Sequence, residues 1–123
     1  MPLSSGFYAS LILTGAASSA FAALNTPSNV AAHTAGPATI VVSWEDNETS
    51  EDNYIVQRYD SGWTTVATLP ANTTYYYDRG LSLNSTHNYR VQALNSGDVS
   101  AFVESGAATT LVYQPNIIFF LAD

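Results

Sequence analysis

The stretch Ala38-Thr-Ile-Val-Val-Ser-Trp44 decides the fold class of this chain. Its residues Ile40, Val42 and Trp44 recur at every second position, which is the period of a β-strand that buries one face. A helix would instead repeat its apolar residues every three to four positions. The stretch therefore predicts a strand that carries a tryptophan into a core.

The same alternation returns in two later stretches. In residues 54–58, Tyr54 and Val56 share a face. In residues 88–93 the inward face is expected to carry Tyr89, Val91 and Ala93, with Arg90 and Gln92 outside. Residues 63–69 are also typical of a strand, although Val66 and Leu69 differ in parity. Further short strands are predicted at residues 73–77 and 99–103.

Turn-forming residues separate these stretches. They recur at short intervals from Asn25 onward, as Pro27, Asn29, Gly36, Pro37, Gly62, Pro70, Gly80 and Gly97. Short strands with frequent turns are typical of a sandwich or barrel. Residues 25–110 therefore predict an all-β fold of about seven strands, in which two antiparallel sheets enclose one core.

Composition limits the function classes. The 123 residues leave room for about one domain, and 3 basic residues against 10 acidic ones give a net charge of −7. Such a chain lacks the electrostatic footprint for DNA, RNA or an anionic membrane. Without cysteine it has no disulfide, thiolate metal site or cysteine nucleophile. Low charge with many Thr, Ser, Asn and Tyr residues favours an extracellular β protein.

Several segments, in their order along the chain, resemble a fibronectin type III domain of bacterial style. They are residues 27–30, 40–44, 54–58, 76–81 and 89–95. The resemblance covers almost all of residues 25–110 and implies an immunoglobulin-like β-sandwich. It also implies that Trp44 is the central core residue, with Leu81, Tyr89 and Val91 packed around it from the other sheet.

One position departs from that family. His87 stands where such domains carry the tyrosine of the tyrosine corner, and Leu83 replaces the nearby proline. The shorter imidazole is expected to make a weaker corner, so His87→Tyr should not lower the melting temperature. We expect no metal or catalytic role for His87, because no second ligand lies at a useful spacing.

Residues 45–53 form an acidic loop that could bind calcium. Carboxylates and amides can supply the oxygen ligands that calcium prefers. The loop lacks the spacing of an EF-hand and has no glycine for its tight bend. We favour a solvated connection between two strands and keep calcium binding as the alternative.

Aromatic residues suggest a carbohydrate site. Trp63, Tyr75 and Tyr77 are candidates for stacking on a sugar ring. Either Tyr75 or Tyr76 must face inward in a strand, and Trp63 lies beside a turn, where aromatic residues often cover a sheet edge. Catalysis within the sandwich is not expected, because neither His33 nor His87 lies near a nucleophile-elbow motif.

The N-terminus is typical of an export signal. A short apolar run follows Phe7 and Tyr8, and Ala20-Phe21-Ala22 fits a cleavage site. Residues 1–22 are therefore predicted to be a signal peptide, although the usual basic residues are missing. The alternative is a retained apolar helix; either is too short for a membrane span. The expected location is secreted, periplasmic or at the cell surface.

Residues 111–123 are expected to form a linker and then the start of another domain. The apolar run in Gln114-Pro-Asn-Ile-Ile-Phe-Phe-Leu-Ala-Asp123 is typical of a strand buried on both faces in an α/β sheet. It resembles the first strand of a sulfatase of the alkaline-phosphatase-like group. That resemblance implies that Asp123 is a calcium ligand in a full-length enzyme. The alternative is an apolar tail that packs on the sandwich.

Two functions are consistent with these features. The first is a non-catalytic accessory module at the N-terminus of a secreted sulfatase-like hydrolase. Only the full-length protein would hydrolyse sulfate esters and hold calcium; the 123 residues need no cofactor. The second is a stand-alone extracellular module that binds carbohydrate or protein. The expected partner is a sulfated polysaccharide or another extracellular glycan.

Overall fold

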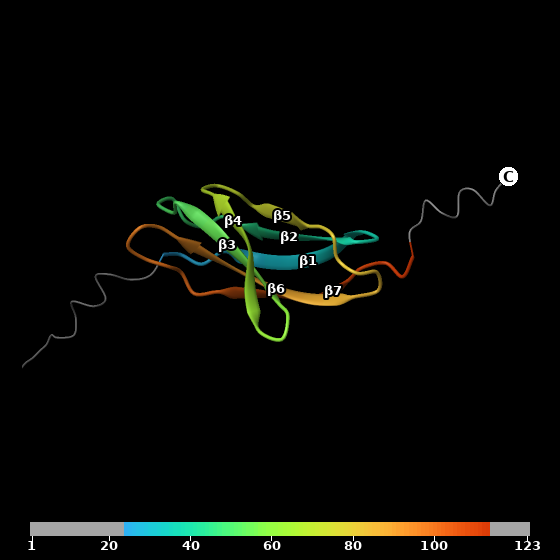
Figure 1. The fold of residues 1–123 in the computed structure, drawn as a ribbon. Helices are drawn as coiled ribbons and strands as arrows, with labels where there is room; N and C mark the ends of the chain where they lie inside the picture. The colour runs from blue at the N-terminus through green and yellow to red at the C-terminus, as the bar shows by residue number, and fades with distance from the viewer. Residues whose placement is uncertain (1–23, 114–123) are drawn as a thin grey trace, which may run out of the picture.

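The computed structural model describes residues 24–113 and shows seven strands without any helix in this range (Figure 1). They are β1 (Ser28–Gly36), β2 (Thr39–Glu45), β3 (Asn53–Tyr59), β4 (Trp63–Pro70), β5 (Tyr75–Asp78), β6 (Thr86–Leu94) and β7 (Val103–Thr109). The predicted all-β sandwich of about seven strands is therefore confirmed. Within the described residues, no helix could cross a membrane.

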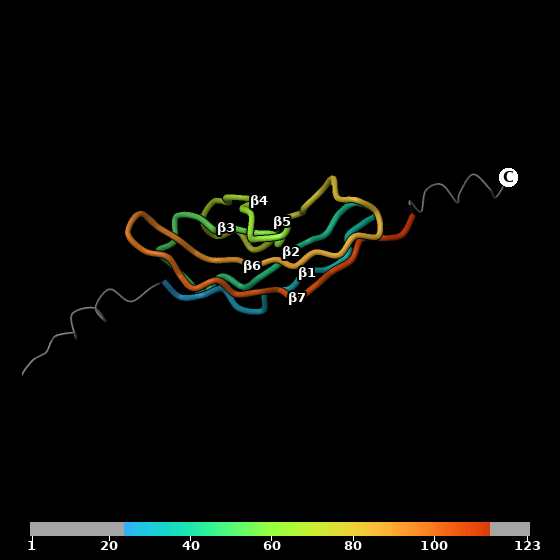
Figure 2. Tube along the Cα trace, turned by 60° about the horizontal axis from the view of Figure 1, so that its bottom comes forward, coloured from blue at the N-terminus to red at the C-terminus, as the bar shows by residue number. Residues whose placement is uncertain are grey.

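The strands form two antiparallel sheets. One has three strands in the order β1-β2-β5, and the other has four in the order β4-β3-β6-β7. The first strand lies beside the last across the sandwich, as the blue and red segments in Figure 2 show. The described chain starts at one end of the sandwich and finishes at the opposite end (Figure 1).

The core lies between the two sheets. Its fully buried side chains come from the three central strands, as Ile40 and Val42 on β2, Tyr54 and Val56 on β3, and Tyr89, Val91 and Ala93 on β6. The predicted inward faces of these strands are confirmed. Each large apolar side chain that is removed from water contributes about 1.5–3 kcal/mol to the driving force for folding.

A β-bulge explains the irregular alternation in β4. Val56 pairs with Ala67, but the next residue, Gln57, pairs with Thr65, so Val66 is an extra residue in the ladder. Val66, Ala67 and Leu69 all pack against the core as a result. The bulge changes the parity of the strand without moving its apolar residues to the solvent.

The strand predicted at residues 99–103 is wrong in its bounds. Only Val99 makes a bridge, to Leu94, and β7 begins at Val103. The Ser100 hydroxyl accepts a hydrogen bond from the Ala93 N–H at 2.9 Å and donates one to the Ala101 carbonyl at 2.8 Å. These bonds between side chain and backbone compete with a regular ladder.

The predictions for the two ends of the chain lie outside the described residues. They are the signal peptide at residues 1–22 and the sulfatase-like strand at residues 115–123, with its calcium ligand Asp123.

Candidate functional site

Trp44 and two of the three residues expected around it are buried inside the sandwich. Trp44 is 4% exposed, and Tyr89 and Val91 are fully buried. Leu81 follows β5, which belongs to the same sheet as Trp44, so the expectation that it packs from the other sheet is wrong. It packs against the core from its margin. The ring centroids of Trp44 and Tyr54 are 5.6 Å apart. This set of residues builds the fold and exposes almost nothing to a ligand.

A buried ionic group joins the two sheets. Asp78, at the end of β5, accepts a hydrogen bond of 2.6 Å from the Tyr89 hydroxyl and one of 2.8 Å from Arg58 Nη1. Burial of Tyr89 and its hydrogen bond to Asp78 raise the pKa of this phenol. Burial lowers the pKa of Arg58, but Asp78 and Asp60 outweigh that effect and raise it overall. The raised pKa keeps Arg58 protonated, so its guanidinium can pair with the Asp78 carboxylate.

Carboxylates of the acidic β2–β3 loop, residues 45–53, accept hydrogen bonds from other groups of the protein. Glu48 accepts hydrogen bonds from the Asn25 N–H at 2.7 Å and from the Ser50 hydroxyl at 2.7 Å. Asp46 Oδ1 accepts one of 2.6 Å from the Tyr54 hydroxyl. The hydrogen bonds of Ser50 and Asn25 lower the pKa of Glu48 from 4.5 to about 2.

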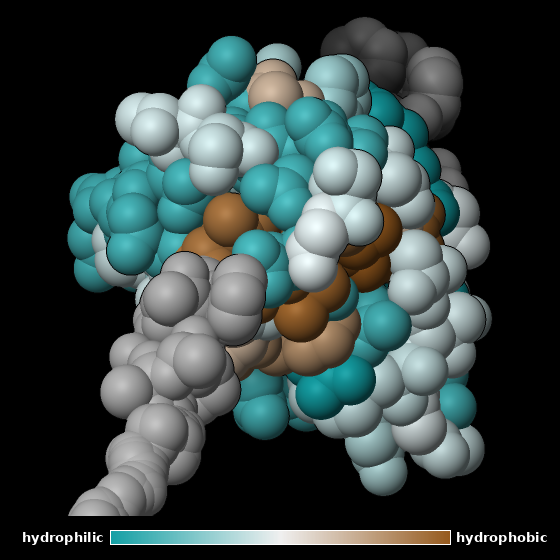
Figure 3. Space-filling view, turned by 90° about the vertical axis from the view of Figure 1, so that its left-hand side faces the viewer, coloured by the Kyte–Doolittle hydropathy of each residue, from teal (hydrophilic) through white to brown (hydrophobic). Residues whose placement is uncertain are grey.

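The hydrogen bonds of this loop engage carboxylate oxygens that a calcium ion would need as ligands. Besides Glu48 and Asp46, Glu51 accepts the Asn72 N–H at 2.8 Å. Among residues 24–113, no three His, Cys, Asp or Glu side chains gather as metal ligands. Figure 3 views the end of the sandwich that carries this loop, where hydrophilic side chains surround a strip of apolar surface. The loop is a structural connection that its own hydrogen bonds hold in place.

Ser85, His87 and Asp60 lie in the order of a hydrolase triad, which the sequence did not suggest. His87 Nε2 is 2.8 Å from Ser85 Oγ, and His87 Nδ1 is 3.9 Å from Asp60 Oδ1. However, Ser85 Oγ donates to the Ser82 carbonyl at 2.6 Å. His87 Nε2 must then donate to Ser85, so it cannot act as the base that activates this hydroxyl.

Two of these contacts build the structure that stands in place of the tyrosine corner. The imidazole of His87 reaches the upstream carbonyl of Ser82 through the Ser85 hydroxyl, where related domains would use one tyrosine. Thr110 Oγ1 donates to the same carbonyl at 2.7 Å and ties the end of β7 to the corner. The hydrogen bond of His87 to Ser85 therefore helps to hold this corner together.

On the outer face of the four-stranded sheet, a cation lies between two aromatic rings. The guanidinium carbon of Arg90 is 4.4 Å from the ring centroid of Trp63 and 3.9 Å from that of Phe102. Arg90 Nε also donates to Gln57 at 2.8 Å. Tyr59 packs edge-on against Trp63, with centroids 5.3 Å apart. A sugar that stacked on Trp63 would compete with these partners.

The other two candidate aromatic residues are exposed on the three-stranded sheet. Tyr75 and Tyr77 are 57% and 40% exposed, and their rings meet edge to face at 5.7 Å. The guanidinium carbon of Arg79 lies 5.0 Å from the Tyr77 ring centroid. Tyr76 points to the other side of the strand, where its hydroxyl donates to the Val66 carbonyl. The alternation of β5 thus separates one structural tyrosine from two exposed ones.

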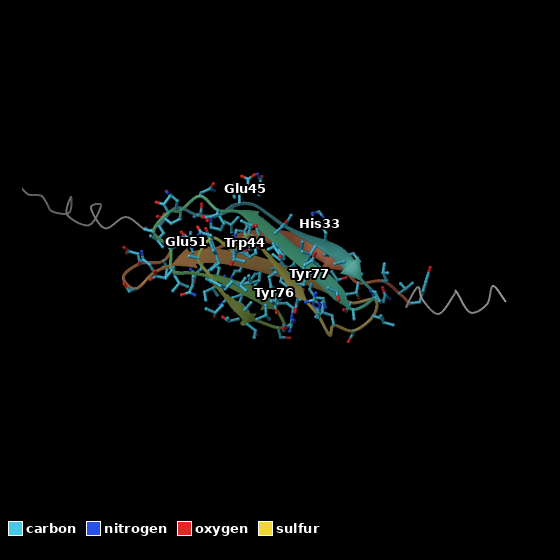
Figure 4. All side chains as sticks on the ribbon, turned by 90° about the horizontal axis from the view of Figure 1, so that it is seen from above. His33, Trp44, Glu45, Glu51, Tyr76 and Tyr77 are labelled. Carbon is cyan, nitrogen blue, oxygen red and sulfur yellow. The ribbon has the colours of Figure 1, made fainter. Side chains whose placement is uncertain are left out.

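Strand pairing defines the surface around the exposed tyrosines. Ser43 lies opposite Tyr75, and Val41 lies opposite Tyr77. Val41 in turn pairs with His33 on β1, which borders this sheet on the far side. Figure 4 labels His33 and Tyr77 on these two edge strands. Ser43 and Val41 are smaller than tyrosine, so the two tyrosine rings project beyond their neighbours on β2.

Comparison with known proteins identifies the fold. No protein-family model and no curated protein matches the chain. Solved structures do match, among them FN3tt, which is 20% identical with a TM-score of 0.65 over 75% of this chain and 99% of that one.

Two further structures illustrate the likeness. A Fn3-like protein from Clostridium thermocellum is 26% identical, with a TM-score of 0.56 over 72% of this chain and 93% of that one. The fn3 domain of human collagen alpha-1(XX) is 17% identical, with a TM-score of 0.62 over 76% and 90% of the two chains. The chain thus has the fibronectin type III fold, as the resemblance predicted.

Proposed function

We propose that residues 25–110 are a non-catalytic accessory module that positions or binds other molecules. The proposal rests on one observation: the side chains that could be reactive form hydrogen bonds within the protein. The Ser85 hydroxyl donates to a backbone carbonyl. The Glu48 and Asp46 carboxylates accept hydrogen bonds from the protein. Within residues 24–113 these groups have their partners, so they stabilise the sandwich rather than a transition state.

The parent protein in this proposal is a secreted sulfatase-like hydrolase. The export pattern of residues 1–22 and the Pro-Asn-Ile-Ile and Leu-Ala-Asp elements of residues 115–123 support it. The described residues start and finish at opposite ends of the sandwich (Figure 1). This arrangement suits a module that lies between an export signal and a following domain. Calcium would be held by Asp123 and by residues beyond it. The proposal gives calcium no role in the sandwich itself.

The coding sequence downstream of Asp123 tests this parentage. We expect an aspartate codon next and a Cys/Ser-x-Pro-x-Arg motif later, because the sulfatase resemblance implies both. A stop codon, or a continuation without that motif, would overturn the link to sulfate-ester hydrolysis.

Deletion of the module from such a parent separates binding from chemistry. With residues 25–110 removed, kcat for a small soluble sulfate ester should stay within about twofold, since the chemistry lies elsewhere. The KM for a polymeric substrate should rise, because the accessory contact is lost. A fall in kcat for the small ester, in a deletion variant with an unchanged melting temperature, would contradict the accessory role.

A second candidate is a stand-alone extracellular module that binds carbohydrate or protein. The exposed pair of Tyr75 and Tyr77 favours it, because large aromatic rings on a sheet surface are typical of binding sites. Retention of the purified chain on a polysaccharide gel, with loss of retention in Tyr75→Ala, is the expected result. Equal mobility with and without every polysaccharide tested would contradict it.

A further inference from the structure

The outer face of β5 joins two exposed aromatic rings to one exposed cation. We infer that Tyr75, Tyr77 and Arg79 form a binding platform for an acidic sugar chain, one that carries carboxylate or sulfate groups. The platform presupposes the binding role proposed above and adds its ligand class. It is independent of the link to a sulfatase.

The aromatic part of the platform is held by the strand. Tyr75 and Tyr77 occupy outward positions of β5, two residues apart, with Ser43 and Val41 beside them on β2. Their edge-to-face contact, at an interplanar angle of 78°, restrains both rings without burying them. Tyrosine loses little conformational entropy on binding, because its side chain has few rotatable bonds. The more exposed ring, that of Tyr75, can pack against the apolar face of a sugar, while Tyr77 holds Arg79 beside it.

The charged part of the platform is Arg79. The chain has three basic residues, all arginines, and the other two are engaged. Arg58 pairs with Asp60 and Asp78, and Arg90 lies between Trp63 and Phe102. Arg79 is exposed and makes no ion pair within residues 24–113. Its planar guanidinium can bind a carboxylate or sulfate through two parallel hydrogen bonds.

Stacking on Tyr77 orients this guanidinium. The guanidinium carbon lies 5.0 Å from the ring centroid, so the attraction between cation and ring holds the charge beside the tyrosine pair. An acidic sugar on the tyrosines would therefore place its anionic group within reach of Arg79. This arrangement selects a sugar with a charged substituent over a neutral one.

The distribution of charge permits an anionic ligand at this place. The net charge of −7 repels polyanions from the molecule as a whole. The acidic β2–β3 loop, however, lies toward the end where the described chain starts, and Glu51 and Tyr77 are well separated along the sandwich in Figure 4. Salt screens exposed charges over about 8 Å at physiological ionic strength, so the loop acts weakly on Arg79.

Binding to three polysaccharides tests the platform. The full chain would be titrated with polygalacturonate, dextran sulfate and neutral dextran at fixed ionic strength. We expect binding to at least one of the two acidic polymers and at least about tenfold weaker binding to dextran. Preference between the two identifies carboxylate or sulfate as the recognised group. Equal affinity for dextran, or no binding to any of the three, would overturn the inference.

Single substitutions assign the contacts. Tyr75→Ala and Arg79→Gln should each weaken binding to the acidic polymer by about fivefold or more, and Arg79→Gln should leave any binding to dextran unchanged. Tyr59→Ala is the matched control, because this tyrosine is 48% exposed on the opposite sheet. Equal losses in the control and in Tyr75→Ala, or full affinity in Arg79→Gln, would overturn the assignment. Melting temperatures verify that each variant is folded.

The outcome is separable from that of the proposed parentage. Absence of binding would remove the platform, while the downstream coding sequence would still decide whether the module belongs to a sulfatase.

Discussion

The Tyr89 hydroxyl donates a hydrogen bond of 2.6 Å to the carboxylate of Asp78, and both residues are buried between the two sheets. Tyr89 comes from β6 and Asp78 from the end of β5, so this bond crosses the core. It fixes the position of β5, the strand whose outer face carries Tyr75 and Tyr77. A buried structural contact thereby supports the candidate binding surface.

Removal of this hydroxyl should destabilise the sandwich. In Tyr89→Phe the buried carboxylate of Asp78 keeps Arg58 but loses one donor. Hydrogen bonds to charged groups contribute about 1.5–3 kcal/mol, so the free energy of unfolding should fall by about that amount. Urea denaturation measures the change. Tyr76→Phe is the control and should cost less, because its hydroxyl makes a longer bond of 3.3 Å to the Val66 carbonyl. Equal losses in the two variants would contradict the special role of Asp78.

The core tryptophan should be the most costly apolar residue to truncate. Trp44 is 4% exposed and packs against Tyr54, although its Nε1 is buried without a hydrogen-bond partner among the described residues. Trp44→Ala should lower the free energy of unfolding by about 3–5 kcal/mol through lost burial and a new cavity. Denaturant titration tests this value. A loss below about 1 kcal/mol would show that the ring is not central to the core.

Acid should weaken the β2–β3 loop through Glu48. Hydrogen bonds from Ser50 and Asn25 lower the pKa of Glu48 from 4.5 to about 2 in the folded state. A lowered pKa stabilises the fold above about pH 4.5, and this contribution is lost as the pH falls toward 2. The melting temperature of Glu48→Gln should therefore lie below that of the wild type at pH 6 and approach it near pH 2. A constant difference across this range would refute the linkage.

The corner at His87 should depend on Ser85. Ser85→Ala removes the bridge between the imidazole and the Ser82 carbonyl and should cost about 1–2 kcal/mol. In a His87→Tyr background the same substitution should cost less, because a longer side chain can reach the carbonyl directly. A double-mutant cycle measures this coupling. Additive effects, or a lower melting temperature in His87→Tyr alone, would contradict the assignment of this corner.

The fold could be predicted from local pattern, because burial on one face imposes a period of two on a strand. Trp44, Tyr54 and Tyr89 all fell on predicted inward positions that the structure confirms. The pattern is irregular or misleading where the backbone leaves that period. Val66 is an extra residue in a bulge, and Ser100 binds the backbone of its own connection. The bulge shows in the sequence only as the difference in parity between Val66 and Leu69, and the hydrogen bonds of Ser100 leave no signal in the alternation of apolar residues.

The candidate site could be predicted only in part. Exposed tyrosines at positions 75 and 77 follow from the alternation of β5, once one of its faces is known to be buried. The stacking of Arg90 between Trp63 and Phe102 could not be foreseen, because these three residues come together only through the order of strands in the sheet. The partners of Arg90 also explain why Trp63 is a poorer platform than Tyr75.

Equilibrium dialysis against one sulfated and one carboxylated oligosaccharide tests most directly the central claim that this chain binds and does not catalyse. The amounts of retained oligosaccharide and of free inorganic sulfate would both be measured, for the wild type and for Tyr75→Ala. We predict that the wild type retains at least one of the two oligosaccharides intact, that Tyr75→Ala retains much less of it, and that free sulfate stays at the level of the buffer control. Release of sulfate by the purified chain, or equal retention by the two proteins, would contradict the account.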